Sequence, residues 1–307
     1  MIVYGPVPSR RLGRSLGVNH VPPKTCTYSC VYCQLGRTNT MISDRRRFYD
    51  PNHIVELVEK RLKKKDVDYV TFVPDGEPTL DINLGKMVKG VNQLGINTAV
   101  ICNASLLWME DVRNDLEYAD WVSIKTDAIT ENIWKKIDRP HGKLKHTDVI
   151  EGMLTFSETY KGTLSTETML VNNLNDGEEP RKVAKFLKNI DPDISYVAIP
   201  TRPPAEKWVK PVDEATVNQT YQVFSKELRD VEYLIGYEGN AFASTGNFEE
   251  DILSITSVHP MREDGVKDLI RNDEANWEDV ERLIDSNKLV ELSYLDNLFY
   301  MRKISSR

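Results

Sequence analysis

Three of the four cysteines in this chain lie within eight residues of one another. Cys26, Cys30 and Cys33 have the spacing C-x3-C-x2-C and follow a predicted strand. Three thiolates on one compact loop can bind three irons of a cubane cluster and leave the fourth iron without a protein ligand. A structural zinc site is the alternative, but it needs four ligands, and only His20 and Cys102 could supply the fourth. The pattern therefore favours an iron-sulfur cluster with one open iron.

A second group of residues follows the predicted strands 68–74 and 97–103. This group consists of Gly76, Glu77, Pro78, Asn103 and Ser105. A glycine lets the backbone approach a ligand closely, and a carboxylate can accept hydrogen bonds from an ammonium group. These residues are therefore candidates for binding a small polar cofactor.

Polar side chains also mark the later strands. Ser123, Lys125 and Asp127 alternate along one segment, which puts them on one face of a strand, and in a barrel that face can be the lumen. A charged lumen needs partners or a ligand, so a salt bridge from Lys125 to Glu167 or Asp127 is the alternative to a catalytic role. The candidate catalytic residues, all predicted on the substrate side, are Lys125, Asp127, Glu167 and Arg202.

The cysteine loop, with Tyr32 just before its last cysteine, resembles the signature of the radical S-adenosylmethionine superfamily. Gly76-Glu-Pro78 resembles the Gly-Gly-Glu-Pro motif of that superfamily, with Asp75 in place of the first glycine, and Asn103-Ala-Ser105 resembles its Asn-Gly-Ser/Thr segment. The resemblance implies a 4Fe-4S cluster on the three cysteines and S-adenosylmethionine on the open iron. Reductive cleavage of this cofactor would yield a 5'-deoxyadenosyl radical.

The resemblance also implies roles for individual residues and for a partner. Tyr32 would lie against the adenine of the cofactor. The remaining cofactor-binding residues would be Gly76, Glu77, Pro78, Asn103, Ser105 and Ser123. The electron would come from an external donor of the flavodoxin or ferredoxin type.

Further segments resemble one branch of the superfamily, the iron-sulfur oxidoreductases related to the tRNA wyosine-base synthases. These segments are Pro8-Ser-Arg-Arg-Leu-Gly13, Arg139-Pro-His141 and Arg202-Pro-Pro-Ala-Glu206. Wyosine synthases carry additional cysteines for a second cluster and a basic surface for tRNA. This chain has no cysteine before Cys26 and a formal net charge of -7, so wyosine synthesis itself is not expected.

Apolar, β-branched runs alternate with helical periodicity through most of the chain. Strands are predicted at 15–21, 68–74, 97–103, 119–125, 163–171, 194–199 and 233–237. Helices are predicted at 51–65, 81–94, 109–116, 147–160, 178–189 and 214–229. The alternation predicts a parallel sheet, and we expect an α/β fold in which residues 1–247 form a partial (β/α)6 TIM-like barrel. Active sites of such barrels gather at the carboxyl ends of the strands.

Residues 248–307 have a different pattern, with short helices at 249–257, 263–272 and 277–287 and strands at 289–293 and 298–304. This order predicts a small winged-helix-like C-terminal domain. The third helix contains Glu278, Asp279, Glu281 and Asp285 against a single Arg282. Duplex DNA is therefore not an expected partner.

Composition limits the possible partners further. Forty Lys and Arg residues against forty-seven Asp and Glu give no global basic field, so any contact with RNA must be local, for example through Arg10 and Arg11 or through Arg45 to Arg47. No apolar run approaches the roughly 18 residues of a membrane span, and no basic leader precedes an apolar core. We therefore expect a cytoplasmic protein that does not enter a membrane.

Together these features predict a radical S-adenosylmethionine enzyme that modifies a macromolecule, either an RNA base or a protein side chain, with the C-terminal domain docking that target. One alternative is a small-molecule substrate, with the C-terminal domain as a cap on the barrel. A different class of protein is also possible: a regulator that uses the cluster as a redox sensor and binds nucleic acid through the C-terminal domain. Glu77 and the acidic third helix argue against a regulator.

Overall fold

The computed structural model describes residues 2–63, 66–236, 239–240, 242 and 244–303. Its main sheet has eight strands. They are β1 (Val3–Ser9), β2 (Gly13–Val18), β5 (Tyr69–Phe72), β6 (Asn97–Cys102), β7 (Trp121–Lys125), β8 (Thr163–Met169), β9 (Ile194–Ala198) and β10 (Val231–Leu234). In the sheet they follow the order β1-β2-β5-β6-β7-β8-β9-β10. The strands from β2 to β10 are parallel to their neighbours, and β1 is antiparallel to β2.

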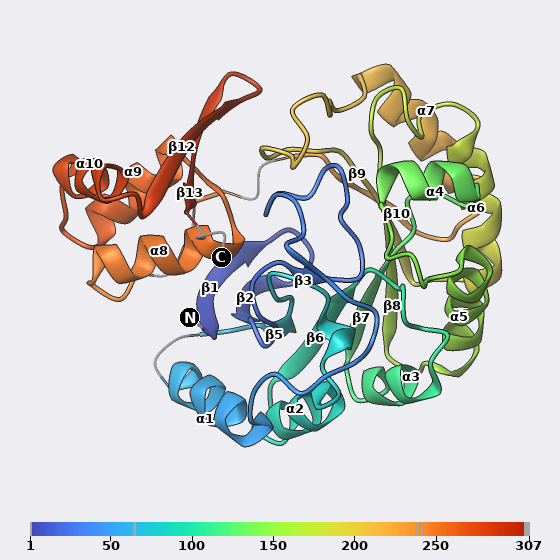
Figure 1. Ribbon diagram of the computed structural model, residues 1–307, viewed down its shortest axis with the longest axis horizontal. Coiled ribbons are helices and arrows are strands. Elements are labelled where there is room, and N and C mark those ends of the chain that lie inside the picture. Colours follow the sequence, from blue (N-terminus) through green and yellow to red (C-terminus); the bar gives the residue numbers. More distant parts are fainter. Residues whose placement is uncertain (1, 64–65, 237–238, 241, 243, 304–307) are drawn as a thin grey trace.

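The sheet curls into a half-barrel, and seven helices follow its outer side (Figure 1). They are α1 (Pro51–Leu62), α2 (Leu84–Asn92), α3 (Glu110–Leu116), α4 (Glu131–Ile137), α5 (His146–Thr159), α6 (Glu179–Ile190) and α7 (Glu214–Ser225). The largest hydrophobic cluster joins strand residues such as Val70 and Val100 to helix residues such as Val58 and Leu187. Burial of each such side chain stabilises the fold by about 1.5–3 kcal/mol. The predicted partial barrel is therefore confirmed.

One strand of the main sheet and one of its outer helices are not predicted from the sequence. The first is β1, which contains Pro6 and Pro8 and changes register between Tyr4 and Val7. Proline cannot donate to a β-ladder and is tolerated at sheet edges and bulges, so the sequence of this edge strand reads as a loop. The second is α4, which has only seven residues. Such a short segment shows little helical periodicity.

The predicted helix 81–94 begins later than expected because another structure precedes it. Pro78–Leu80 form a 3-10 turn, η1, whose first backbone N–H group, that of Thr79, is capped by the Glu77 side chain. The Glu77 carboxylate accepts from the backbone N–H of Thr79 at 3.0 Å. The helix α2 then starts at Leu84.

The C-terminal segment, called the tail below, contains α8 (Phe248–Val258), β11 (Met261–Arg262), α9 (Glu263–Asn272), α10 (Trp277–Asp285), β12 (Leu289–Tyr294) and β13 (Asn297–Arg302). The three helices and the hairpin β12–β13 match the prediction, and β11 adds a third strand in the order β11-β13-β12. The tail has its own hydrophobic cluster, against which Val7 of β1 packs. It lies beside β1 at the edge of the half-barrel (Figure 1). Its assignment as winged-helix-like stays a prediction.

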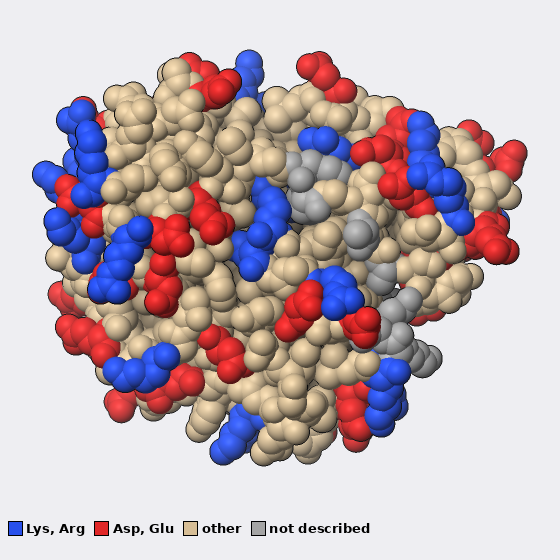
Figure 2. Space-filling view, turned by 180° about the vertical axis from the view of Figure 1, so that it is seen from behind, with Lys and Arg blue, Asp and Glu red and all other residues tan. Residues whose placement is uncertain are grey.

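Within the described residues, none of the helices combines the length and the apolar character needed to cross a membrane. On the face shown in Figure 2, Lys and Arg side chains are interspersed with Asp and Glu side chains. That face therefore offers no extended area of one charge.

Candidate active site

The cysteine loop crosses the carboxyl end of the half-barrel and is held there by backbone hydrogen bonds. Cys26 ends the short strand β3 (Thr25–Cys26), which pairs with β4 (Thr40–Met41), and Cys30 and Cys33 lie in the turns that follow. The backbone N–H groups of Ser29 and Val31 donate to carbonyls at the end of α4, at 3.0 and 2.9 Å. These bonds fix the loop over the strand ends.

Three thiols on one loop are the type of ligand that binds an iron-sulfur cluster. All three cysteines are free and half-buried. Burial raises the pKa of the Cys26 thiol to about 12 and raises the pKa values of Cys30 and Cys33 as well. Metal binding needs the thiolate form, so binding of a cluster would draw these protons off. Two side chains donate toward the sulfurs, Lys125 to Cys30 at 3.2 Å and Asn103 to Cys26 at 3.6 Å, as is common around such clusters.

Lys125 lies at the cysteine loop and is surrounded by carboxylates. Its Nζ forms ion pairs with Asp127 at 3.1 Å and with Asp138. Although burial lowers the pKa of Lys125, the two carboxylates raise it well above its ordinary value. The predicted internal salt bridge to Asp127 therefore exists. The predicted pairing of Lys125 with Glu167 is wrong, because Glu167 has another partner described below.

Asp127 connects three parts of the site. Its Oδ2 accepts a hydrogen bond from the Tyr32 hydroxyl, and its Oδ1 accepts from the backbone N–H of Met169 at 2.9 Å. Burial raises the pKa of Asp127 to about 6, and the neighbouring Lys125 opposes that rise. The ring of Tyr32 is thereby anchored beside the cysteine loop, at the position from which the resemblance predicts contact with adenine.

Gly76 allows the motif after β5 to meet the cysteine loop. A Cβ atom at Gly76 would lie 1.9 Å from the carbonyl oxygen of Thr25, so no other residue fits. The backbone N–H of Glu77 donates to that same oxygen at 3.1 Å. The buried Glu77 carboxylate accepts from the hydroxyl of Thr79 at 2.6 Å and from the backbone N–H of Asn103 at 2.8 Å. Gly76 therefore lets the backbone approach the Thr25 carbonyl of the same chain closely, whereas the sequence suggested a close approach to a ligand.

The segment after β6 is joined to the cysteine loop through Thr27. The Asn103 amide and the Ser105 hydroxyl each lie 2.7 Å from the Thr27 hydroxyl. Between them, Ala104 has φ 65°, in the left-handed region that favours glycine. This conformation explains why glycine suits the middle position of the related Asn-Gly-Ser/Thr segment.

Glu167 and Ser123 face the lumen and are contacted by Arg11. A guanidinium nitrogen of Arg11 lies 2.5 Å from the Glu167 carboxylate and 3.4 Å from the Ser123 hydroxyl. Arg11, named from the sequence as one possible local contact for RNA, therefore reaches into the half-barrel and forms the ion pair of Glu167.

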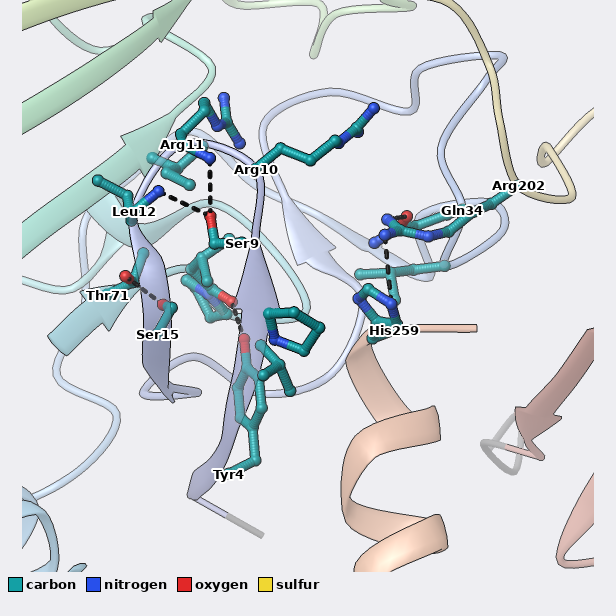
Figure 3. Close-up of a pocket in the computed structure, with 16 residues that line it drawn as sticks. Tyr4, Ser9, Arg10, Arg11, Leu12, Ser15, Gln34, Thr71, Arg202 and His259 are labelled. Carbon is teal, nitrogen blue, oxygen red and sulfur yellow. Dashed lines mark hydrogen bonds between the residues drawn. The ribbon is translucent and has the colours of Figure 1, made fainter. Parts of the chain in front are cut away.

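A cavity of about 180 Å³ lies between the β1–β2 turn, the cysteine loop and the tail (Figure 3). Arg10 and Arg11 line it from the turn, and Gln34, next to Cys33, lines it from the cysteine loop. Arg202 enters from the loop after β9 and lies 2.5 Å from the Gln34 side-chain oxygen and 3.3 Å from His259. Sequence reasoning missed His259, because nothing in the tail's sequence sets this histidine apart.

Two other predicted residues have structural partners. Glu206 accepts from Arg37 at 2.8 Å and from Arg139 at 2.5 Å, which joins the loop after β9 to the cysteine loop. Arg45 is buried and forms ion pairs with Asp111, at 2.5 Å, and with Asp115. If the target is RNA, the Arg45 side chain is therefore too enclosed to be one of its local contacts.

Known proteins resemble this chain along its whole length. A protein of Methanocaldococcus jannaschii named UPF0026 protein MJ1312 is 45% identical over 312 residues, which covers 100% of this chain and 97% of that protein. A protein of Brachyspira hyodysenteriae named GTPase Obg is 31% identical over 96% of this chain, although the match spans only 45% of that protein. The tRNA 4-demethylwyosine synthase of Saccharomyces cerevisiae is 29% identical over 39% of this chain and 17% of its own length.

Solved structures show the same fold at low sequence identity. The structure of TYW1 with a lysine-pyruvate adduct has a TM-score of 0.54 at 15% identity and covers 70% of this chain and 74% of that chain. Streptococcus suis SuiB bound to its precursor peptide SuiA also has a TM-score of 0.54 at 15% identity, over 70% of this chain and 47% of that one.

The model of the radical SAM superfamily matches residues 21–187, which include the three cysteines, the Gly76-Glu-Pro78 turn and Asn103. More than half of the chain is therefore covered by one family. The chain belongs to the radical S-adenosylmethionine superfamily, whose enzymes use a 4Fe-4S cluster to cleave S-adenosylmethionine reductively.

Proposed function

We propose that Cys26, Cys30 and Cys33 hold the cluster and that the strand ends beside them hold S-adenosylmethionine. The supporting observation is that Thr25 and Thr27 of the cysteine loop are bonded to Glu77, Asn103 and Ser105, so all three motifs meet at one place. The cofactor-binding residues we propose are Tyr32, Gly76, Glu77, Pro78, Asn103, Ser105 and Ser123. The cluster and S-adenosylmethionine together would supply a 5'-deoxyadenosyl radical for abstraction of a substrate hydrogen.

The chain's own residues prepare the site for that chemistry. Lys125 holds a positive charge beside the Cys30 sulfur, and Asp127 orients Tyr32. On the substrate side, Glu167 fixes Arg11 in the lumen, and Arg202 lines the cavity beside the cysteine loop. The sequence places all four residues on the substrate side as catalytic candidates. From these contacts we instead assign Lys125 and Asp127 to the positioning of the cofactors, and we keep Glu167 and Arg202 on the substrate side.

The substrate we propose is part of a macromolecule, an RNA base or a protein side chain, whose reacting group enters the cavity while the tail contacts the rest. Partial similarity to an enzyme named for its action on tRNA supports this proposal. A small molecule is the second candidate, and one observation favours it: the tail contributes His259 to the cavity wall, as a cap would.

The same proposal assigns different roles to two domains. Residues 1–247 would carry the radical chemistry, and residues 248–307 would form a separate winged-helix-like domain. The separate hydrophobic cluster of the tail supports this division. Radical S-adenosylmethionine enzymes generally need an external electron donor, and for this chain we propose one of the flavodoxin or ferredoxin type.

Anaerobic purification tests the cofactor assignment directly. We expect about four irons and four sulfides per chain, and formation of 5'-deoxyadenosine when reductant and S-adenosylmethionine are added. Changing Cys26, Cys30 or Cys33 to Ala should abolish the cluster. Cys102 is a buried cysteine on β6, so the Cys102→Ala variant should keep the cluster. Stoichiometric zinc without iron after reconstitution would overturn the proposal, and loss of the cluster in Cys102→Ala would overturn the ligand set.

A further inference from the structure

Basic side chains from three separate segments converge on the cavity beside the cysteine loop. Arg10 and Arg11 come from the turn between β1 and β2, Arg202 from the loop after β9, and His259 from the end of α8. In Figure 3, the Arg10 side chain extends from the turn toward the side on which Arg202 and His259 lie. Residues far apart in the sequence therefore surround one small space.

The positive charge of this cavity comes from its arginines. Arg10 is an exposed residue whose guanidinium donates to the backbone carbonyl of Gly236 at 2.7 Å, and partial enclosure by the cavity lowers its pKa although Glu167 opposes that effect. Burial, together with Arg202 and Arg10, holds the pKa of His259 well below its usual value, so this imidazole is neutral near pH 7. An anion in the cavity would be attracted by the guanidinium groups of Arg10 and Arg202, which line it.

Hydrogen-bond donors and the size of the cavity narrow the class of anion. The Ser9 hydroxyl oxygen accepts from the backbone N–H groups of Arg11 and Leu12, at 3.3 and 3.2 Å, which leaves its own proton available to a ligand. Planar guanidinium groups match the oxygens of phosphate with paired hydrogen bonds. A space of about 180 Å³ accommodates a phosphate together with part of the group that carries it.

We propose that this cavity binds a phosphate group of the substrate through Arg10, Arg202 and the Ser9 hydroxyl. The inference rests on the proposed function, because it places the substrate beside Gln34 and therefore next to Cys33. A phosphate held there would fix one end of the substrate at the inner wall of the half-barrel and direct the other end toward the cysteine loop.

Calorimetric titration of the full-length, cluster-loaded protein with inorganic phosphate tests the proposal. We expect saturable binding by the wild type and a roughly tenfold or greater loss of affinity in Arg10→Gln and in Arg202→Gln. Arg202→Lys keeps the charge without the planar fork and should lose less. The matched control is Arg229→Gln, because Arg229 is exposed and pairs with Asp191 on the surface.

Competition distinguishes the two sources of a phosphate group. Displacement of inorganic phosphate by adenosine 5'-monophosphate alone would assign the site to a small phosphorylated substrate, and displacement by an RNA oligonucleotide would assign it to a nucleic acid; either supports the proposal.

Iron content and S-adenosylmethionine binding are measured on the same samples. If both are normal in the wild type and phosphate does not bind, or binds equally well to Arg10→Gln and Arg202→Gln, the phosphate site is wrong. If the wild type lacks the cluster, the proposed function fails instead.

Discussion

Lys125 shows how a single charge can serve the cofactor site. Its ammonium group lies 3.2 Å from the Cys30 sulfur and is held there by Asp127 and Asp138. Charges and hydrogen bonds near the sulfurs set the reduction potential of an iron-sulfur cluster. Since reduction adds negative charge to the cluster, a fixed cation beside one ligand favours the reduced state.

We therefore expect Lys125→Met to lower the midpoint potential of the cluster by tens of millivolts. An EPR-monitored redox titration measures this shift. Lys125→Arg keeps the charge and should shift the potential less, and Lys188→Met, on the exposed surface of α6, should leave it unchanged. Lys125→Met also leaves Asp127 and Asp138 without their cation, so its thermal stability is measured in parallel. An unaltered potential in a stable, cluster-containing Lys125→Met protein would contradict this role.

Asp75, which replaces the first glycine of the related motif, makes a pH-dependent contribution to stability. It is buried, and burial raises its pKa to about 7, although a hydrogen bond from Asn19 at 3.0 Å opposes the rise. In the unfolded chain its pKa is about 3.9. The folded state therefore binds the proton more tightly, and the stability due to this group is fully present below about pH 4 and lost as the pH rises through 7.

Asp75→Asn removes this titration. The unfolding midpoint of the wild type relative to Asp75→Asn should therefore fall between about pH 4 and pH 7, by an amount that corresponds to at most about 4 kcal/mol. Buried His20, with a pKa lowered by burial to about 4, has the opposite dependence, but it is present in both proteins and cancels in the difference. A difference that stays constant over this range would show that Asp75 is ionised throughout.

At the scale of elements, the contact between the turn after β5 and strand β3 determines whether the site can form. Gly76→Ala would put a methyl group 1.9 Å from a backbone carbonyl, which cannot rotate away as a side chain could. We expect this variant to lose cluster content and several degrees of thermal stability. The control is Gly177→Ala, because a Cβ atom there meets nothing within 4 Å. Normal iron content in Gly76→Ala would mean that the turn can move away from β3.

The order of strands and helices could be predicted from sequence because apolar periodicity reports directly on burial. The strands β5, β6, β7, β8 and β9 lie within the predicted ranges. Strand β1 could not be predicted in this way, since prolines within it remove the ladder donors by which a strand is recognised. Predicting β1 would have required knowing that β2 has a free edge for it to pair with.

Motifs of the site could be predicted, but their partners could not. The convergence of the cysteine loop with Glu77 and Asn103 follows from their places at neighbouring strand ends. The ion pair of Glu167 with Arg11 joins residues 156 positions apart, and no local pattern encodes such a pair. His259 is the extreme case, because its place in the cavity depends on how the tail packs against the barrel.

At the scale of the whole molecule, the tail lies against both the loop after β9 and the cysteine loop. His259 lines the cavity with Arg202, and the Tyr294 hydroxyl donates to the carbonyl of Pro200 at 3.0 Å. A second cavity of about 260 Å³ lies between the hairpin β12–β13, the cysteine loop and the Pro203–Pro204 segment. Because the tail lines the cavity proposed for the substrate, we expect its loss to weaken substrate binding more than cofactor binding.

Truncation after Gly246 tests this separation. The tail's hydrophobic cluster contains Phe248 and Tyr300 and is distinct from the barrel's cluster, so the barrel should keep its own core. We expect the truncated chain to assemble its cluster, bind S-adenosylmethionine and release 5'-deoxyadenosine without coupling to product, while phosphate binding weakens because the tail's part of the cavity wall is removed. Iron content measures cluster assembly, and calorimetric titration measures phosphate binding. A truncated chain that cannot assemble the cluster would show that the tail caps the barrel, and this would favour the small-molecule substrate.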